Sequence, residues 1–227
     1  MKLLYNARIC TLNPAQETDS ALLIEHGEIV AVGGDELLDS RAEKFDLGGR
    51  VVLPGLTDAH IHLQHYALGL QKIDCETSTL EECLRRVAER VNTAKDGEWI
   101  LGHGWNQNEW SSWPHASHLD SIAPNHPVYL TAKSLHAAWA NSAALKLAGI
   151  TASTPNPENG EIQRDERGQP TGILLETAME LVSAKIPQPS INELAEAIRA
   201  AQPILWKMGL TGVHDFDRRA CFMALQQ

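Results

Sequence analysis

No apolar run in this 227-residue chain approaches the roughly 18 residues that a membrane-spanning helix needs. The first residues, Met1 to Asn6, have no extended apolar stretch of the kind that a secretory signal peptide carries. Lys and Arg form no cluster, and the formal charge of −10 argues against a nucleic-acid partner. We therefore expect a soluble globular protein of the cytoplasm that binds neither a membrane nor a nucleic acid.

The chain also lacks any Cys-x-x-C pair. Its cysteines are Cys10, Cys75, Cys83 and Cys221. This wide spacing favours reduced thiols in the cytosol and argues against a structural zinc site. We expect all of them to be small buried hydrophobic side chains.

The most informative segment that is present is PGLTDAHIH, residues 54–62. Residues 51–53 are expected to form a short buried strand before it. Because side chains alternate faces along a strand, His60 and His62 should point the same way and could both bind one metal ion. Asp58 is placed to accept a hydrogen bond in support of these ligands. Surface or hydrogen-bonded histidines are the alternative explanation for an isolated His-x-His pair.

The chain divides by pattern near Leu53. Short apolar runs separated by Gly and Pro turns predict a small antiparallel β domain over residues 1–53. The expected strands are 3–12, 21–25, 29–32 and 51–53. Residues 54–227 alternate strands with helices, which is typical of βα units around a parallel sheet and makes this a second domain of an α/β protein.

Helix starts are marked by two capping boxes, since Thr79 and Ser190 are each followed three residues later by Glu. Pro203 is expected to kink or interrupt the second of these helices. A further helix is predicted over residues 138–148. The polar segment 151–170, rich in Pro and Gly, predicts an inserted surface loop.

Four predicted strands could line a (β/α)8 barrel, which needs eight strands in about 250 residues. These strands end at His62, Gly102, Thr131 and Phe216, and residues 172–175 are an extra candidate. The sequence therefore predicts about half of a barrel.

The pattern PG-x-x-D-x-H-x-H resembles the signature of the amidohydrolase superfamily. Further blocks resemble its YtcJ-like, or amidohydrolase-3, family, which includes N-substituted formamide deformylases. These blocks are residues 102–105, 136–145, 170–176 and 208–215. They occur in the family's order and cover essentially the whole chain. The resemblance implies the N-terminal half of a TIM-like barrel, preceded by an incomplete composite β-sandwich.

The resemblance also implies a function, namely metal-dependent hydrolysis of a carbon–nitrogen bond in a small-molecule amide or formamide. One or two divalent ions, expected to be zinc, would activate water. His60 and His62 would be metal ligands, and Glu176 would be the carboxylate that bridges or supports the metals. Asp58 and His136 would be catalytic residues. The alternatives are a Glu176 that only favours a helix start and a His136 that only hydrogen-bonds Asn141.

Several other residues are weaker candidates. Lys133 is expected to be solvated rather than a carboxylated bridge between two metals. His103 and His214 lie at predicted strand ends. Four tryptophans could line an apolar pocket beside the metal or simply pack together. They are Trp105, Trp110, Trp113 and Trp139.

In the superfamily, two later histidines and an aspartate base lie beyond the fourth strand. Asp215, on a strand matched to the fourth, does not replace that base. We therefore expect the chain to be half of a longer protein, associating as a homo-oligomer or with a missing C-terminal half. The competing hypothesis is a catalytically inactive half barrel that binds metal or serves as an interaction protein.

Overall fold

The computed structural model describes all 227 residues and divides them into two compact units. Unit 1 contains Met1–Ile61 and Pro203–Asp215, and unit 2 contains His62–Gln202 and Phe216–Gln227. The domain boundary expected near Leu53 remains a prediction. No helix of the chain is both long enough and apolar enough to traverse a bilayer.

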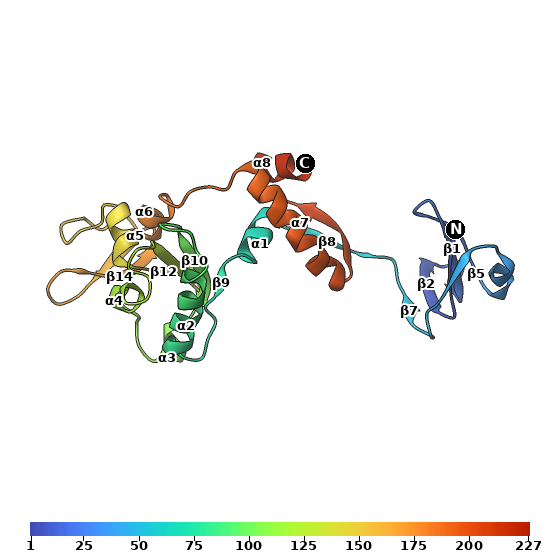
Figure 1. Ribbon diagram of the computed structural model, residues 1–227, viewed down its shortest axis with the longest axis horizontal. Coiled ribbons are helices and arrows are strands. Elements are labelled where there is room, and N and C mark those ends of the chain that lie inside the picture. Colours follow the sequence, from blue (N-terminus) through green and yellow to red (C-terminus); the bar gives the residue numbers. More distant parts are fainter. The chain divides into compact units, whose positions relative to one another are not determined.

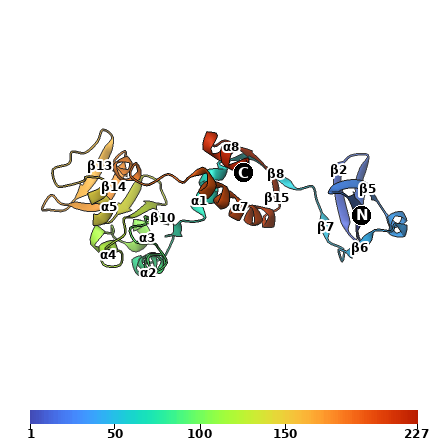
Figure 2. The ribbon, with the colours of Figure 1, turned by 45° about the horizontal axis from the view of Figure 1, so that its top comes forward.

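The first part of unit 1 consists of short strands and one 3-10 helix. They are β1 (Lys2–Tyr5), β2 (Arg8–Asn13), β3 (Gln16–Asp19), β4 (Ala21–Glu25), β5 (Glu28–Gly33), η1 (Asp35–Asp39), β6 (Glu43–Asp46) and β7 (Val51–Val52). One sheet has the order β5-β4-β1-β6 and another the order β3-β2-β7 (Figure 2). Buried Leu3 and Ile9 anchor the two sheets.

These sheets are mixed, so the expectation of a purely antiparallel domain was wrong. β1 pairs with β4 in antiparallel fashion but with β6 in parallel, and β2 pairs with β7 in parallel. The strand expected over residues 3–12 is broken because Asn6 has a φ of 55°. β3 and β6 escaped prediction because their residues are mostly polar and mostly exposed. β7 is not the expected buried strand, since Val51 is 59% exposed.

Unit 1 also contains a two-stranded parallel sheet of β8 (Leu56–Ile61) and β15 (Leu210–Asp215) (Figure 1). The register pairs Leu56 with Leu210 and Ile61 with Asp215, so the two strands end together. The strands approach closely before β8 begins, because a Cβ on Gly55 would lie 2.0 Å from Thr211 Oγ1. Gly55 of the motif is thus a steric requirement.

Unit 2 is built on a six-stranded sheet with the order β13-β14-β12-β11-β10-β9. The strands are β9 (Ile73–Asp74), β10 (Ile100–Trp105), β11 (Val128–Ala132), β12 (Ala137–Ala140), β13 (Gly160–Arg164) and β14 (Pro170–Glu176). β9, β10 and β11 run parallel. β12, β14 and β13 continue the sheet in antiparallel fashion, and β13 and β14 form a hairpin (Figure 2).

Unit 2 also contains helices (Figure 1). They are α1 (Leu63–Gly69), α2 (Leu80–Val91), α3 (Gln107–Trp110), α4 (Ala116–Asp120), α5 (Ser142–Leu147), α6 (Met179–Ser183) and α8 (Arg219–Leu225). α2 packs against β10, α4 against β12, and α5 against β11. The core between them consists of fully buried apolar side chains, among them Val87, Ile100 and Leu130.

Both predicted capping boxes mark real helix starts. Thr79 Oγ1 accepts a hydrogen bond from the Glu82 N–H at 3.2 Å. At the start of α7 (Ile191–Lys207) the box is reciprocal, because Ser190 accepts from the Glu193 N–H at 3.3 Å and donates its own N–H to Glu193 at 2.8 Å. α7 continues through Pro203 without interruption.

Two further expectations were wrong. The helix predicted over 138–148 begins only at Ser142, because the fully buried Ala137–Ala140 run pairs between β11 and β14 as β12. The loop expected over 151–170 contains strand β13, whose single apolar residue, Ile162, is 1% exposed.

The expected row of barrel strands was also wrong. β8 and β15 pair with each other and not with β10 or β11, which belong to the separate six-stranded sheet. β15 is therefore the immediate neighbour of β8 rather than a strand three places away.

Candidate functional site

Asp58 and His60 both lie on β8, close to its carboxyl end. Asp58 Oδ1 accepts a hydrogen bond from the His60 N–H at 2.9 Å. The carboxylate thus fixes the backbone that carries the predicted ligand. In register, the end of this strand lies beside Asp215 at the end of β15. Asp58 therefore has an observed local role, while its predicted catalytic role stays a prediction.

His62 follows one residue after β8 and occupies the N-cap position of α1. The alternation argument therefore covers His60 but not His62, which has left the strand. Its Nδ1 lies 3.2 Å from Asp217 Oδ1. Asp217 Oδ2 accepts a hydrogen bond from the Gln64 N–H at 2.6 Å. The Asp217 side chain is only 14% exposed, so this contact is partly shielded from water.

Sequence reasoning missed Asp217. It lies 155 residues from His62, in the short link between β15 and α8, outside the blocks that resemble the family. No local pattern marks it. The only available signal was its place two residues beyond the end of a strand that carries His-Asp.

His136 and Glu176, by contrast, were both predicted, and the structure brings them together. His136 Nδ1 lies 3.1 Å from Glu176 Oε2, and the Glu176 N–H donates to the His136 carbonyl oxygen at 3.0 Å. Both side chains are exposed. Glu176 ends β14 with a φ of 51°, a conformation that is strained for any residue other than Gly and that recurs at functional sites.

The alternatives for this pair were wrong. His136 precedes strand β12, not a helix, and the hydrogen bonds of the Asn141 side chain go to other residues. The Asn141 side chain instead caps α5. Glu176 does not lie in a first helical turn, because the next helix begins at Met179.

Lys133 behaves as the solvated lysine that we expected. Its Nζ donates to Glu76 Oε1, and the side chain is 58% exposed. Glu76 raises the pKa of Lys133. A higher pKa keeps the amine protonated, whereas carboxylation requires the neutral amine.

The tryptophans form a packed cluster. Trp105 and Trp139 are fully buried, and the ring centroids of Trp105 and Trp110 lie 6.1 Å apart. Trp113 meets Trp105 edge-on at 6.0 Å. The Trp105 Nε1 donates to the Leu130 carbonyl oxygen at 2.8 Å. These rings thus pack against one another. Three of the four cysteines are buried as expected, and Cys10 is partly exposed.

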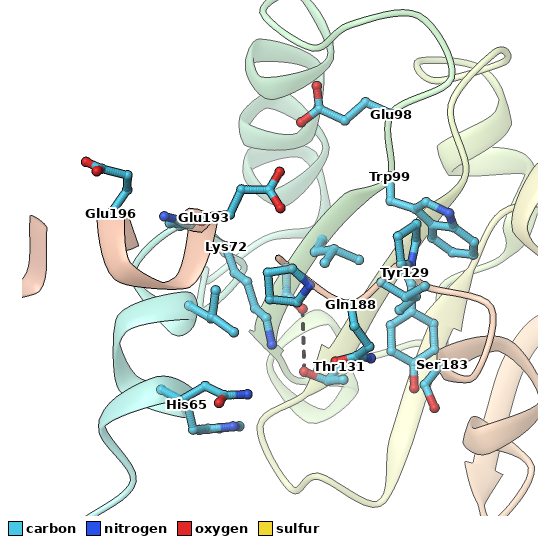
Figure 3. Close-up of a pocket in the computed structure, with 18 of the residues that line it drawn as sticks. His65, Lys72, Glu98, Trp99, Tyr129, Thr131, Ser183, Gln188, Glu193 and Glu196 are labelled. Carbon is cyan, nitrogen blue, oxygen red and sulfur yellow. Dashed lines mark hydrogen bonds between the residues drawn. The ribbon is translucent and has the colours of Figure 1, made fainter. Parts of the chain in front are cut away.

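Unit 2 contains a groove of about 970 Å³ over the face of β10 and β11. Its lining includes Asp217, which contacts His62, and Gln64. In Figure 3 the Lys72 side chain is directed into the groove toward Thr131. Burial lowers the pKa of Lys72 and raises the pKa of Tyr129 to about 12. The groove therefore disfavours charge on both side chains.

The predicted ligands are of the chemical kinds that bind zinc, but the structure does not gather them into one cluster. The group of potential ligands that it does gather is Asp215, Asp217 and Cys221. Imidazole and carboxylate are ordinary zinc ligands, and a ligating His typically has its other ring nitrogen bound to a carboxylate. The His62–Asp217 contact provides this second feature. The predicted ligands from this chain are His60, His62 and Glu176.

Comparison with known proteins gives a consistent result. The family model described as "Amidohydrolase family" matches residues 43–224. The chain is 37% identical over 231 residues to an N-substituted formamide deformylase of Arthrobacter pascens, covering 94% of this chain and 42% of that protein. It is 33% identical over 217 residues to the putative amidohydrolase YtcJ of Bacillus subtilis, covering 92% and 41%.

Among solved structures, an uncharacterized metal-dependent hydrolase from Pyrococcus furiosus superimposes with a TM-score of 0.74 at 26% identity. The superposition covers 99% of this chain and 46% of that one. The chain thus spans less than half the length of these relatives.

Proposed function

The chain belongs to the amidohydrolase family, and we propose that it forms part of a metal-dependent hydrolase that cleaves the carbon–nitrogen bond of a small-molecule amide or formamide. One observation carries the proposal. The His-x-His motif begins at the carboxyl end of β8, where β15 ends beside it in parallel register. Active sites of (β/α)8 barrels lie at the carboxyl ends of such strands. The similarity to a formamide deformylase supports the substrate class.

In this proposal, β8 and β15 are adjacent strands of a (β/α)8 barrel. α7 leads directly into β15, as the helix of a βα unit leads into the next parallel strand. The strands β1 to β7 form a small composite β-sandwich before the barrel. The six-stranded sheet of unit 2 then belongs to the connection between the two barrel strands.

The metal ligands from this chain are His60, His62 and Glu176, and one or two zinc ions are expected. Such an ion lowers the pKa of a bound water to about 7 and polarises the substrate carbonyl. Asp58 holds the backbone of His60 in place. His136 holds the Glu176 carboxylate through Nδ1 and is the residue of this chain that is poised to exchange a proton with it.

The decisive experiment measures bound metal and hydrolysis in the same samples. Elemental analysis of the 227-residue chain should show zinc, which the His60→Ala and His62→Ala variants lose. His65→Ala is the matched control, because His65 is an exposed histidine on α1 just beyond the motif. Any hydrolysis of N-substituted formamides that the chain shows should disappear together with the metal.

The other outcomes separate the alternatives. Stoichiometric zinc without hydrolysis of any amide supports an inactive metal-binding or interaction protein. A wild-type chain that binds no zinc after reconstitution contradicts the proposed site.

A further inference from the structure

Asp217 contacts a predicted metal ligand, His62, through the imidazole ring of that ligand. Its two carboxylate oxygens have separate partners. Oδ1 lies 3.2 Å from His62 Nδ1, and Oδ2 accepts from the Gln64 N–H at 2.6 Å. Two donors at the start of α1 thus hold one carboxylate, which comes from the far end of the chain.

This geometry determines the chemistry of the imidazole. A neutral histidine carries one ring N–H, and a carboxylate beside one nitrogen places the proton there. Asp217 therefore favours the tautomer of His62 with the proton on Nδ1, which leaves the lone pair for metal binding on Nε2. A carboxylate that accepts a hydrogen bond from one ring nitrogen also makes the imidazole a stronger metal ligand.

We propose that Asp217 is a positioning residue that fixes the tautomer and the ring orientation of His62 for metal binding through Nε2. The inference rests on the proposed function in one respect, because it takes His62 as a ligand. The contact itself exists without a metal and can be tested without one.

The first test uses the metal-free chain labelled with ¹⁵N-histidine. Two-bond ¹H–¹⁵N correlation spectra at about pH 8, where histidine is neutral, report which ring nitrogen of His62 carries the proton. The His62→Ala variant identifies the signal. Wild type should show the proton on Nδ1. In Asp217→Asn the amide oxygen can still accept from the Gln64 N–H, while the amide nitrogen donates to Nδ1. The proton should then move to Nε2.

The second test measures zinc affinity by competition with a chelator. Asp217→Asn should bind zinc about 10- to 100-fold more weakly than wild type. Its thermal midpoint in the absence of metal should match that of wild type, because the hydrogen bond to Gln64 is retained. Asp96→Asn is the matched control, since Asp96 is exposed in the same unit. This control should bind zinc like wild type.

The outcomes distinguish the two proposals. A wild type that loses zinc affinity in His62→Ala but keeps it in Asp217→Asn overturns the inference and leaves the proposed function intact. A wild type that binds no zinc overturns the proposed function, and the tautomer spectrum then still decides whether Asp217 controls His62. An unchanged tautomer in Asp217→Asn overturns the inference by itself.

Discussion

Asn141 joins Val128 through a hydrogen bond of 2.9 Å between the Asn141 side-chain oxygen and the Val128 N–H. The same oxygen accepts from the Ala144 N–H at 3.0 Å and so caps α5. The side-chain nitrogen donates to the carbonyl oxygens of Ala123 and His126. A fully buried amide thus uses all of its hydrogen-bonding capacity to tie β11, α5 and the loop after α4 together.

We expect Asn141→Ala to lower the free energy of unfolding by about 3 kcal/mol, because it removes a cap and leaves several buried groups without partners. Urea unfolding followed by tryptophan fluorescence measures this, since Trp105 and Trp139 are buried in the same unit. Asn192→Ala, at an exposed helical position, should change stability by less than about 0.5 kcal/mol. Equal effects of the two variants would contradict the role of Asn141.

Gly172 should not tolerate a side chain. It has a φ of 100°, and a Cβ there would lie 2.4 Å from the Ala140 carbonyl oxygen of the neighbouring strand. Gly168 also has a positive φ, of 76°, but a Cβ there would meet nothing within 4 Å. Gly168→Ala should therefore destabilise by about 1 kcal/mol. Gly172→Ala should cost at least about 2 kcal/mol more, because the backbone of β12 must move. Similar urea midpoints for the two variants would rule out the close approach.

Glu82 makes the stability of α2 depend on pH. Hydrogen bonds from Arg85 and Arg86 lower the pKa of Glu82 from 4.5 to about 2. Because the pKa is lower in the folded chain, the stabilisation is fully present above about pH 4.5 and is lost as the pH falls toward 2. The thermal midpoint of Glu82→Gln should therefore lie below that of wild type at pH 7 and approach it near pH 2. A difference that stays constant over this range would contradict the ion pairs.

Glu176 should show a conflict between stability and function. Its φ of 51° suits Gly, so Glu176→Gly should unfold at the same or a higher temperature than wild type. The variant should nevertheless lose metal if Glu176 is a ligand. Thermal unfolding and elemental analysis of one preparation test both statements. Glu166→Gly is a control for the loss of an exposed carboxylate in the β13–β14 turn.

Exposed large apolar side chains predict association with a second copy of the chain. Those in unit 1 include Leu56, Ile204, Trp206 and Met208, and those near the end of unit 2 include Phe216, Phe222, Met223 and Leu225. Contiguous exposed apolar side chains often mark an interface. Light scattering should detect oligomers at micromolar concentration, and Trp206→Glu with Phe222→Ser should shift them toward monomer. Leu147→Ser, at an isolated exposed site, should not. A monodisperse wild-type monomer would contradict this.

The features predicted correctly from sequence are those that depend on neighbouring residues. The capping boxes at Thr79 and Ser190 and the strand Ala21–Glu25 need only local signals. Residues 138–140 were expected to begin a helix, but they belong to a buried strand that pairs with β11 and β14. β3 and β6 carry no apolar pattern, and only their partners make them strands.

The same contrast between local and long-range signals holds for the candidate site. The His60-x-His62 motif is visible because its spacing is local. The pairing of His136 with Glu176 joins two residues that were each identified separately. β8 and β15 pair with each other although they are far apart in the sequence. The contact between Asp217 and His62 likewise joins residues at opposite ends of the chain. No local pattern specifies contacts of that range.

The sheet of β8 and β15 has a consequence for the order of folding. About 150 residues separate the two strands, and synthesis at about 5 to 20 residues per second takes on the order of 10 to 30 s to supply them. All six strands of the other sheet emerge within that interval and can pair among themselves. β8 must therefore wait with both edges unpaired until β15 has been synthesised.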